Sequence, residues 1–187
     1  MWPWGHLAVG YLCFVAVTIL RRGDRRSVPC LVAVAVGTQL PDLVDKPLAW
    51  SMSLLPSGRS LAHSLLLAAL VIVLVSRVAT TNDREMVTLP FAIGYLSHLL
   101  SDLGPEVVLG LLRGDLTQLQ WVTYLLWPVL SSPPYPNDTS FIQHFLAFEL
   151  SSYVAFQFVL FGAAIAVWIG DGAPGVAETR RTLSQLS

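Results

Sequence analysis

Long runs of apolar residues that contain no charge are the feature that most restricts the fold of this chain. The clearest run, residues 61–75, has no acidic or basic side chain apart from one histidine. A helix on the surface of a soluble protein needs a polar face, and these runs have none. Only 12% of the residues are charged, against about 25% in a typical soluble domain. The sequence therefore predicts an all-α integral membrane helical bundle.

The apolar runs predict about five transmembrane helices. The second run is short for a bilayer core that needs about 20 residues, and it ends at Pro41, so a re-entrant element is an alternative there. The tryptophans Trp2 and Trp4 precede the first run and suit an interfacial position. The five runs are residues 7–20, 28–40, 61–75, 87–103 and 141–169.

The stretch between the fourth and fifth runs alternates apolar and polar residues. We expect residues 107–112 and 116–130 to form amphipathic helices on the membrane surface, with a sixth crossing as the alternative. The chain is then a single membrane domain, 1–187. It divides into a four-helix part (1–103), an interfacial region with a loop (104–140), and a last span with a cytoplasmic tail (141–187).

Basic residues predict the orientation in the membrane. With five crossings, eight of the 11 arginines and lysines fall on one side of the membrane, and Lys46, Arg59 and Arg113 fall on the other. The side with more basic residues faces the cytoplasm. We therefore expect a multi-pass protein of the plasma (inner) membrane with its N-terminus outside and its C-terminus inside. A net charge of −1 leaves no footprint for nucleic acid, so membrane lipids are the expected partners.

This orientation sorts the histidines and several aspartates to one membrane surface. The ends of the predicted helices that carry them all face the outside. A scatter of such residues along the chain would not produce that arrangement. The group consists of His6, Asp42, Asp45, His63, His98, Asp102 and His144.

Spacing within this group suggests a metal site. His98 and Asp102 are four residues apart, which places them on one helix face, and Asp42 and Asp45 are three apart and could converge on one ion. Imidazole with carboxylate is a ligand set of zinc and related divalent metals. The alternatives are a hydrogen-bonded packing pair for His98 with Asp102 and a turn residue for Asp42. His144 has no acid at helical spacing and suits an interfacial role.

Four sequence blocks resemble those of the membrane-bound metal-dependent hydrolases, also described as inner-membrane-associated hydrolases and compared with zinc-dependent phospholipase C. The resemblance covers about residues 5–103, in the order and spacing of the blocks. They read Gly5-His6-Leu-Ala-Val-Gly10, Gly37-Thr-Gln-Leu-Pro41-Asp42-Leu-Val-Asp45, Gly58-Arg59-Ser-Leu-Ala-His63-Ser64 and Gly94-Tyr95-Leu-Ser-His98-Leu-Leu-Ser-Asp102.

The resemblance implies five functional positions, His6, Asp42, His63, His98 and Asp102, and a divalent metal, zinc before manganese or magnesium. This chain departs from the family pattern in two places. Lys46 follows Asp45 where the pattern has a histidine, and the first histidine of the third block is absent. Two potential ligands are thus missing, which weakens the case for a second metal.

The leading functional hypothesis is a metal-dependent hydrolase that acts at the extracytoplasmic face on a phosphate ester or a phospholipid. His63, His98 and Asp102 would hold the metal, with Asp42 as a further ligand or general base; Asp42 and His63 are the catalytic positions. The metal would lower the pKa of water toward about 7. Arg59 and Lys46 would bind the phosphate.

Two rival functions remain open from the sequence. The first is a membrane protein without enzymatic activity that binds a metal or a lipid headgroup, which the missing histidines favour. The second is a proton- or ion-conducting bundle. Conduction needs polar residues along the depth of the spans, and the inner halves of the first, third and fifth runs have almost none.

Overall fold

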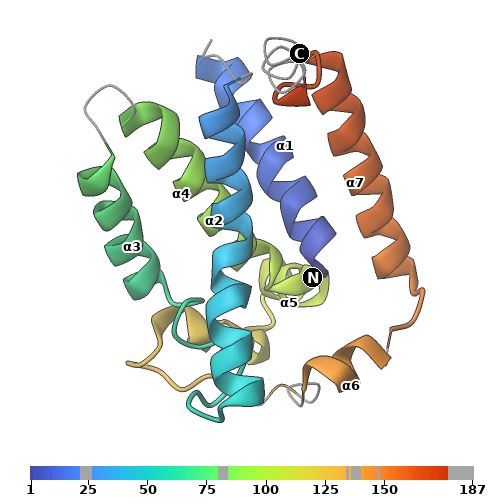
Figure 1. Cartoon of the computed structure of the whole chain (residues 1–187). Helices are drawn as coiled ribbons and strands as arrows, with labels where there is room; N and C mark the ends of the chain where they lie inside the picture. Colours follow the sequence, from blue (N-terminus) through green and yellow to red (C-terminus); the bar gives the residue numbers. More distant parts are fainter. Residues whose placement is uncertain (22–26, 80–83, 134, 136–139, 147, 177–187) are drawn as a thin grey trace.

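The protein is a bundle of helices, seen here in a computed structural model (Figure 1). The described residues form helices and no strand, which confirms the all-α membrane class. They are 1–21, 27–79, 84–133, 135, 140–146 and 148–176.

Three helices in the described residues are long and apolar enough to cross a membrane. These are α1 (Pro3–Arg21), α2 (Val28–Lys46) with its continuation, and α7 (Ser152–Gly170). A fourth span results if α4 (Arg84–Ser101) and α5 (Gly104–Leu112), which are bent by 78° at their junction, count as one. The predicted number of five is therefore approximate, because the fifth candidate is a shorter helix.

That shorter helix is α3 (Leu65–Val78), with 14 residues. It begins later than the predicted run because Ser64 caps it: the Ser64 side chain accepts a hydrogen bond from the backbone N–H of Leu66. Capping fixes the first turn by satisfying an N–H group that has no partner inside the helix. The preceding residues, including His63, are thereby kept in a loop.

The second predicted run does not end at Pro41. Helix α2 continues through Pro41 to Lys46, and a π-helical turn, η1 (Pro47–Ser51), extends it, so that the apolar helical stretch covers 24 residues. Proline removes one backbone donor, but membrane bundles tolerate it where neighbouring groups satisfy the freed carbonyl. Asp42 and Asp45 consequently lie on a helix instead of in a turn.

The last span is shorter than predicted. Residues 141–146 form a separate short helix, α6 (Phe141–Leu146), and the long helix α7 begins at Ser152. The Ser151 side chain caps α7 by accepting a hydrogen bond from the N–H of Val154. The predicted C-terminal tail beyond residue 176 lies outside the described residues.

The interfacial region folds as short helices at the same end of the bundle as the N-terminus (Figure 1). Helix α5 is followed by η2 (Leu116–Leu126), a 3-10 helix capped by Asp115, whose side chain accepts from the N–H of Thr117. Tyr124 of η2 is completely buried and donates a hydrogen bond to the carbonyl of Leu99 at 3.0 Å. This contact fixes η2 beneath the end of α4.

Helices α1, α2 and α4 form the centre of the bundle, with α3 beside α4 and α7 beside α1 (Figure 1). The α2–α4 contact is close because glycines face it. A Cβ atom on Gly37 would lie 2.4 Å from the carbonyl oxygen of Phe91, and one on Gly94 would lie 2.4 Å from that of Val34. Small residues at such crossings are a usual means of helix association in membranes.

The cysteines differ in their environments. Cys30 is buried in an apolar cluster with Phe14 and Val34, whereas Cys13, on α1, is exposed. Neither belongs to the histidine and aspartate cluster described below.

Candidate metal centre

Asp45 fixes the loop that carries His63. The Asp45 side chain is completely buried and accepts hydrogen bonds from three backbone N–H groups of the loop, at 2.8–3.2 Å. Its Oδ2 also lies 2.9 Å from Nδ1 of His63. An ionised carboxylate only accepts hydrogen bonds, so Nδ1 of His63 carries the proton. The other ring nitrogen, Nε2, therefore presents a lone pair.

The close α2–α4 contact fixes His98 in the same tautomer as His63. Nδ1 of His98 lies 2.6 Å from the carbonyl oxygen of Thr38, which sits next to Gly37 on α2. A carbonyl oxygen cannot donate, so Nδ1 of His98 must be the donor. Nε2 of His98 is again left with a lone pair.

His6 completes a set of three imidazoles. Its Nδ1 lies 3.0 Å from Oγ of Ser101, and the Ser101 hydroxyl donates its single proton to the carbonyl of His98. Nδ1 of His6 is therefore the donor to Ser101, and Nε2 of His6 carries the lone pair. The His6 ring stacks on the His98 ring with the centroids 3.7 Å apart.

These nitrogens converge with two carboxylates. Nε2 of His63 lies 3.1 Å from Nε2 of His98, 3.6 Å from Oδ1 of Asp42 and 3.4 Å from Oδ2 of Asp102. Nε2 of His98 lies 3.7 Å and 3.9 Å from the same two oxygens. One ligand atom from each of Asp42, His63, His98 and Asp102 lies within 4.8 Å of the others. His6 adjoins this group, with Nε2 at 3.2 Å from Oδ1 of Asp102.

The arrangement fits a single divalent metal ion. Zinc–nitrogen distances of 2.0–2.1 Å imply ligand separations of about 3.3 Å in a tetrahedral site. The five separations quoted for Asp42, His63, His98 and Asp102, from 3.1 to 3.9 Å, are close to that value. No described residue makes a hydrogen bond to Oδ1 of Asp42 or to Nε2 of His6, although both atoms are buried. Buried polar atoms are normally satisfied, so such atoms indicate a missing partner.

The lone pairs of His63 and His98 face each other and repel unless a positive charge lies between them. The carboxylates around His63 shift its pKa in the same direction. Burial by itself lowers the pKa of His63, but hydrogen bonds with Asp102 and Asp45 raise it, and the result lies above the ordinary value. The cluster therefore favours a cation at this position, either a proton or a metal ion.

Three cationic groups contact the carboxylates of Asp42 and Asp102. Nζ of Lys46 lies 2.6 Å from Oδ2 of Asp42, and Nε of Arg59 lies 2.8 Å from Oδ2 of Asp102. The α-amino group of Met1 lies 2.8 Å from Oδ1 of Asp102. Burial lowers the pKa of the Arg59 guanidinium, but the Asp102 carboxylate more than offsets this and the pKa lies above its ordinary value, so Arg59 stays charged.

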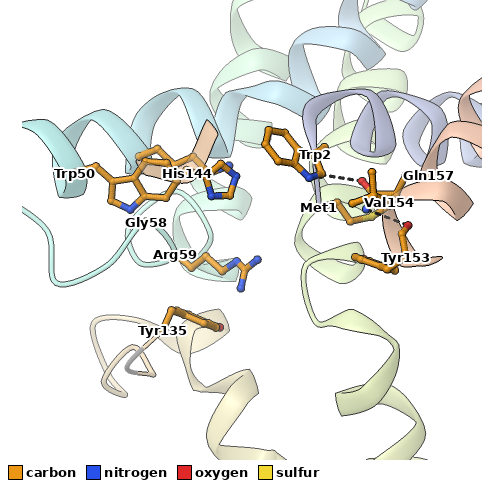
Figure 2. Close-up of a pocket in the computed structure, with 11 residues that line it drawn as sticks. Met1, Trp2, Trp50, Gly58, Arg59, Tyr135, His144, Tyr153, Val154 and Gln157 are labelled. Atoms are coloured by element: carbon orange, nitrogen blue, oxygen red, sulfur yellow. Dashed lines mark hydrogen bonds between the residues drawn. The ribbon is translucent and has the colours of Figure 1, made fainter. Parts of the chain in front are cut away.

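A cavity of about 340 Å³ lies next to the cluster. Figure 2 shows Arg59 reaching into it, with Tyr135 on one side and Trp50 and His144 across from it. The Arg59 guanidinium lies over the Tyr135 ring, 4.6 Å from its centroid, and Lys46 lies 5.4 Å from the centroid of the Trp50 ring. Two cationic side chains, each beside an aromatic ring, thus border a cavity next to the histidine–aspartate cluster.

The structure brings together all five residues that the resemblance implied, namely His6, Asp42, His63, His98 and Asp102. It places Lys46 and Arg59 at the adjoining cavity. His144 lines that cavity, where its ring lies 4.8 Å from the ring of Trp2, and it is outside the ligand group. Burial first, and then the nearby Lys46, lower the pKa of His144.

Asp45 does not share an ion with Asp42, because its oxygens are turned toward the His63 loop. Its role as the partner of His63 was not predicted. The sequence holds one signal for this role. On a helix, residues three apart point in directions that differ by about 60°, so Asp45 can contact other neighbours than Asp42. Tyr135, which supports Arg59, carries no spacing signal that links it to the cluster.

Fold and site together define a helical membrane protein with a buried histidine–aspartate cluster at one end of the bundle. A family model, the YdjM inner membrane protein, matches residues 1–171. The chain belongs to this inner-membrane protein family. Neither a curated protein nor a solved structure is significantly similar to it.

Proposed function

We propose that this protein is a membrane-bound metal-dependent hydrolase of phosphate esters, phospholipids included. The observation that carries the proposal is the convergence of imidazole lone pairs with two carboxylates. Two buried atoms there, Oδ1 of Asp42 and Nε2 of His6, have no hydrogen-bond partner among the described residues. A divalent cation bound there, zinc before manganese or magnesium, supplies Lewis acidity toward water and a phosphoryl oxygen.

The side chains of the site suit distinct roles in such a reaction. His63, His98 and Asp102 hold the cation, with His6 beside them. Oδ1 of Asp42 serves as a fourth ligand or accepts the proton of the attacking water, since Lys46 engages only its Oδ2. Asp45 holds the His63 ring in its orientation, as carboxylates that accept a hydrogen bond from a ligating histidine do in other metal sites.

Charge favours an anionic substrate. The three carboxylates of Asp42, Asp45 and Asp102 are matched by three cationic groups, Lys46, Arg59 and the α-amino group of Met1. A divalent cation brings the sum of these charges to +2, which favours binding of an anion such as a phosphate ester. Arg59 presents a planar fork of donors to phosphate oxygens, and its Nε bond to Asp102 fixes that fork.

Hydrolysis of a water-soluble diester, bis(p-nitrophenyl) phosphate, by the detergent-purified protein tests this function. We expect turnover that a chelator abolishes and that zinc or manganese restores. Asp42→Asn should lower kcat/KM by about 100-fold or more, because it removes a ligand or the base. Glu106→Gln makes the same chemical change on the exposed face of α5 and should leave turnover unchanged. A protein that binds metal but hydrolyses neither diesters nor monoesters would instead be a binding protein.

The proposed site is extracytoplasmic, with the N-terminus outside and the C-terminus in the cytoplasm of the cell. The support is the distribution of basic residues, eight of 11 on the side opposite the cluster. Reporter fusions after Ser187 and within residues 131–138 should therefore report opposite sides, cytoplasmic and external respectively. Two reporters on the same side would contradict this orientation.

A further inference from the structure

A second cavity, of about 220 Å³, lies along the seam between α1 and α2, with α7 as its third wall. Its lining is apolar, and it lies within helices long enough to span the membrane. The polar atoms of Tyr11 and Trp168 are engaged beyond it, with Asp171 and with the carbonyl of Pro174. Residues that line it include Leu7, Tyr11, Leu31, Ala35, Phe161 and Ile165.

A third cavity, of about 130 Å³, lies between the first turn of α1 and the last turns of α2. It reaches Asp42 and Lys46, and it shares Lys46 with the main cavity beside the metal cluster. Its outer rim is formed by Leu43 and Phe145, whose side chains are 68% and 61% exposed. Exposed apolar side chains at this depth suit contact with lipid. The third cavity thus joins Asp42 and Lys46 to exposed apolar side chains.

The two smaller cavities follow one seam. Pro3 borders the third cavity, while Leu7 and Tyr11 border the second; these residues are four apart and lie on one face of α1. On α2, which runs the opposite way, Gln39 borders the third cavity, and Ala35 and Leu31 border the second, again four apart.

The stripe on each helix is eight residues long, about 12 Å at 1.5 Å per residue. One leaflet of a bilayer core is about 15 Å deep, half of about 30 Å. The two cavities share no lining residue, and a hydrogen bond from Nε2 of Gln39 to the carbonyl of Pro3 crosses the seam at the third cavity. Together they extend from Asp42 and Lys46 along α1 and α2 over nearly the depth of one leaflet. An amphiphile with an anionic head and an apolar chain matches both ends of it.

We propose that this seam binds one acyl chain of a phospholipid whose phosphate lies between Lys46 and Arg59, so that the lipid enters the site sideways from the bilayer. The inference rests on the proposed function for the fate of the lipid. Binding itself requires only the seam and the two cations. In this proposal a substrate lipid need not leave the membrane, because the exposed apolar side chain of Leu43 borders the third cavity.

Photo-crosslinking tests the site without relying on hydrolysis. The probe is phosphatidylglycerol with a diazirine at the middle of one acyl chain, mixed into phosphatidylcholine vesicles that hold the purified protein and a chelator. We expect crosslinks on Leu7, Leu31 and Ala35. Ala35→Trp should lower this labelling about fivefold or more, since a bulky ring fills the groove. Val36→Trp, on the outer face of α2 and 47% exposed, is the matched control and should not lower it.

Lys46→Ala distinguishes a lipid bound in the seam from ordinary boundary lipid. Losing one charge-assisted contact to phosphate should lower seam labelling about tenfold, whereas labelling by boundary lipid should not depend on Lys46. Leu7→Trp repeats the groove test from α1 if Ala35→Trp fails to fold. Labelling spread evenly over the bundle, or unaffected by Lys46→Ala, would overturn the inference. Diester hydrolysis with no seam labelling rejects this inference alone, and seam labelling with no hydrolysis rejects the enzymatic function alone.

Discussion

Replacing His98 by alanine is expected to reduce the bound divalent metal from about one ion per chain to less than about a tenth. Substitution of residues that only hydrogen-bond to metal ligands lowers metal affinity by about 10–100-fold. Loss of a direct ligand should lower it by at least about 100-fold. Nε2 of His98 lies within 3.9 Å of donor atoms on His63, Asp42 and Asp102, so its loss opens the centre of the set.

Asp102→Asn should have a similar effect on metal content with less effect on folding. The asparagine amide oxygen can still accept the hydrogen bond from Nε of Arg59, but it lacks the charge that binds a metal ion. The measurement is elemental analysis of protein purified from zinc-supplied cells, with thermal unfolding as the folding control.

His144→Ala is the matched control for the metal site. His144 is at the same end of the bundle, yet its ring lies tilted against those of Trp2 and Trp50, and it is not in the ligand group. Its loss should leave metal content nearly unchanged. If wild-type protein carries no divalent metal, or if Asp102→Asn retains full occupancy, the cluster is a hydrogen-bonded packing network and the metal-site hypothesis is wrong.

Gly94→Ala should destabilise the protein by about 1–3 kcal/mol, the range seen when a methyl group is forced into a packed interior. Helix propensity by itself predicts the opposite sign, since alanine exceeds glycine by about 1 kcal/mol. The added Cβ would lie 2.4 Å from the carbonyl oxygen of Val34 and 3.1 Å from the backbone nitrogen of Thr38. Backbone atoms cannot rotate away, so α2 and α4 must separate.

Gly162→Ala on α7 provides the comparison, because no neighbouring atom lies within 4 Å of the position of its Cβ. This variant should be neutral or slightly stabilising. Thermal unfolding in detergent, followed by tryptophan fluorescence, measures both. Separation of α2 from α4 also moves Thr38 away from His98, so Gly94→Ala should lower metal affinity as well. Equal melting temperatures for the two variants would show that the α2–α4 contact is looser than described.

The class of protein follows from the sequence alone. Apolar runs without charges, such as residues 61–75, need either a protein core or hydrocarbon around them, and a chain of 187 residues has too little interior to bury several of them. The four-residue spacing of His98 and Asp102 likewise places both on one helix face without tertiary information. The sequence therefore predicted the helical bundle and the residues that the structure gathers into one cluster.

Local patterns of this kind do not encode the distances between helices. Those distances decided the remaining features of the fold and of the site. Pro41 suggests a helix end in the sequence, yet α2 continues through it to Lys46, as prolines in membrane helices can allow. Asp45 reads as a second ligand, yet the loop of residues 60–63 folds over it and takes its oxygens. The tautomers of His63 and His98 depend on Asp45 and on the Thr38 carbonyl, which contacts made by the folded chain bring into reach. Periodicity determines which face a residue occupies, and packing determines what that face meets.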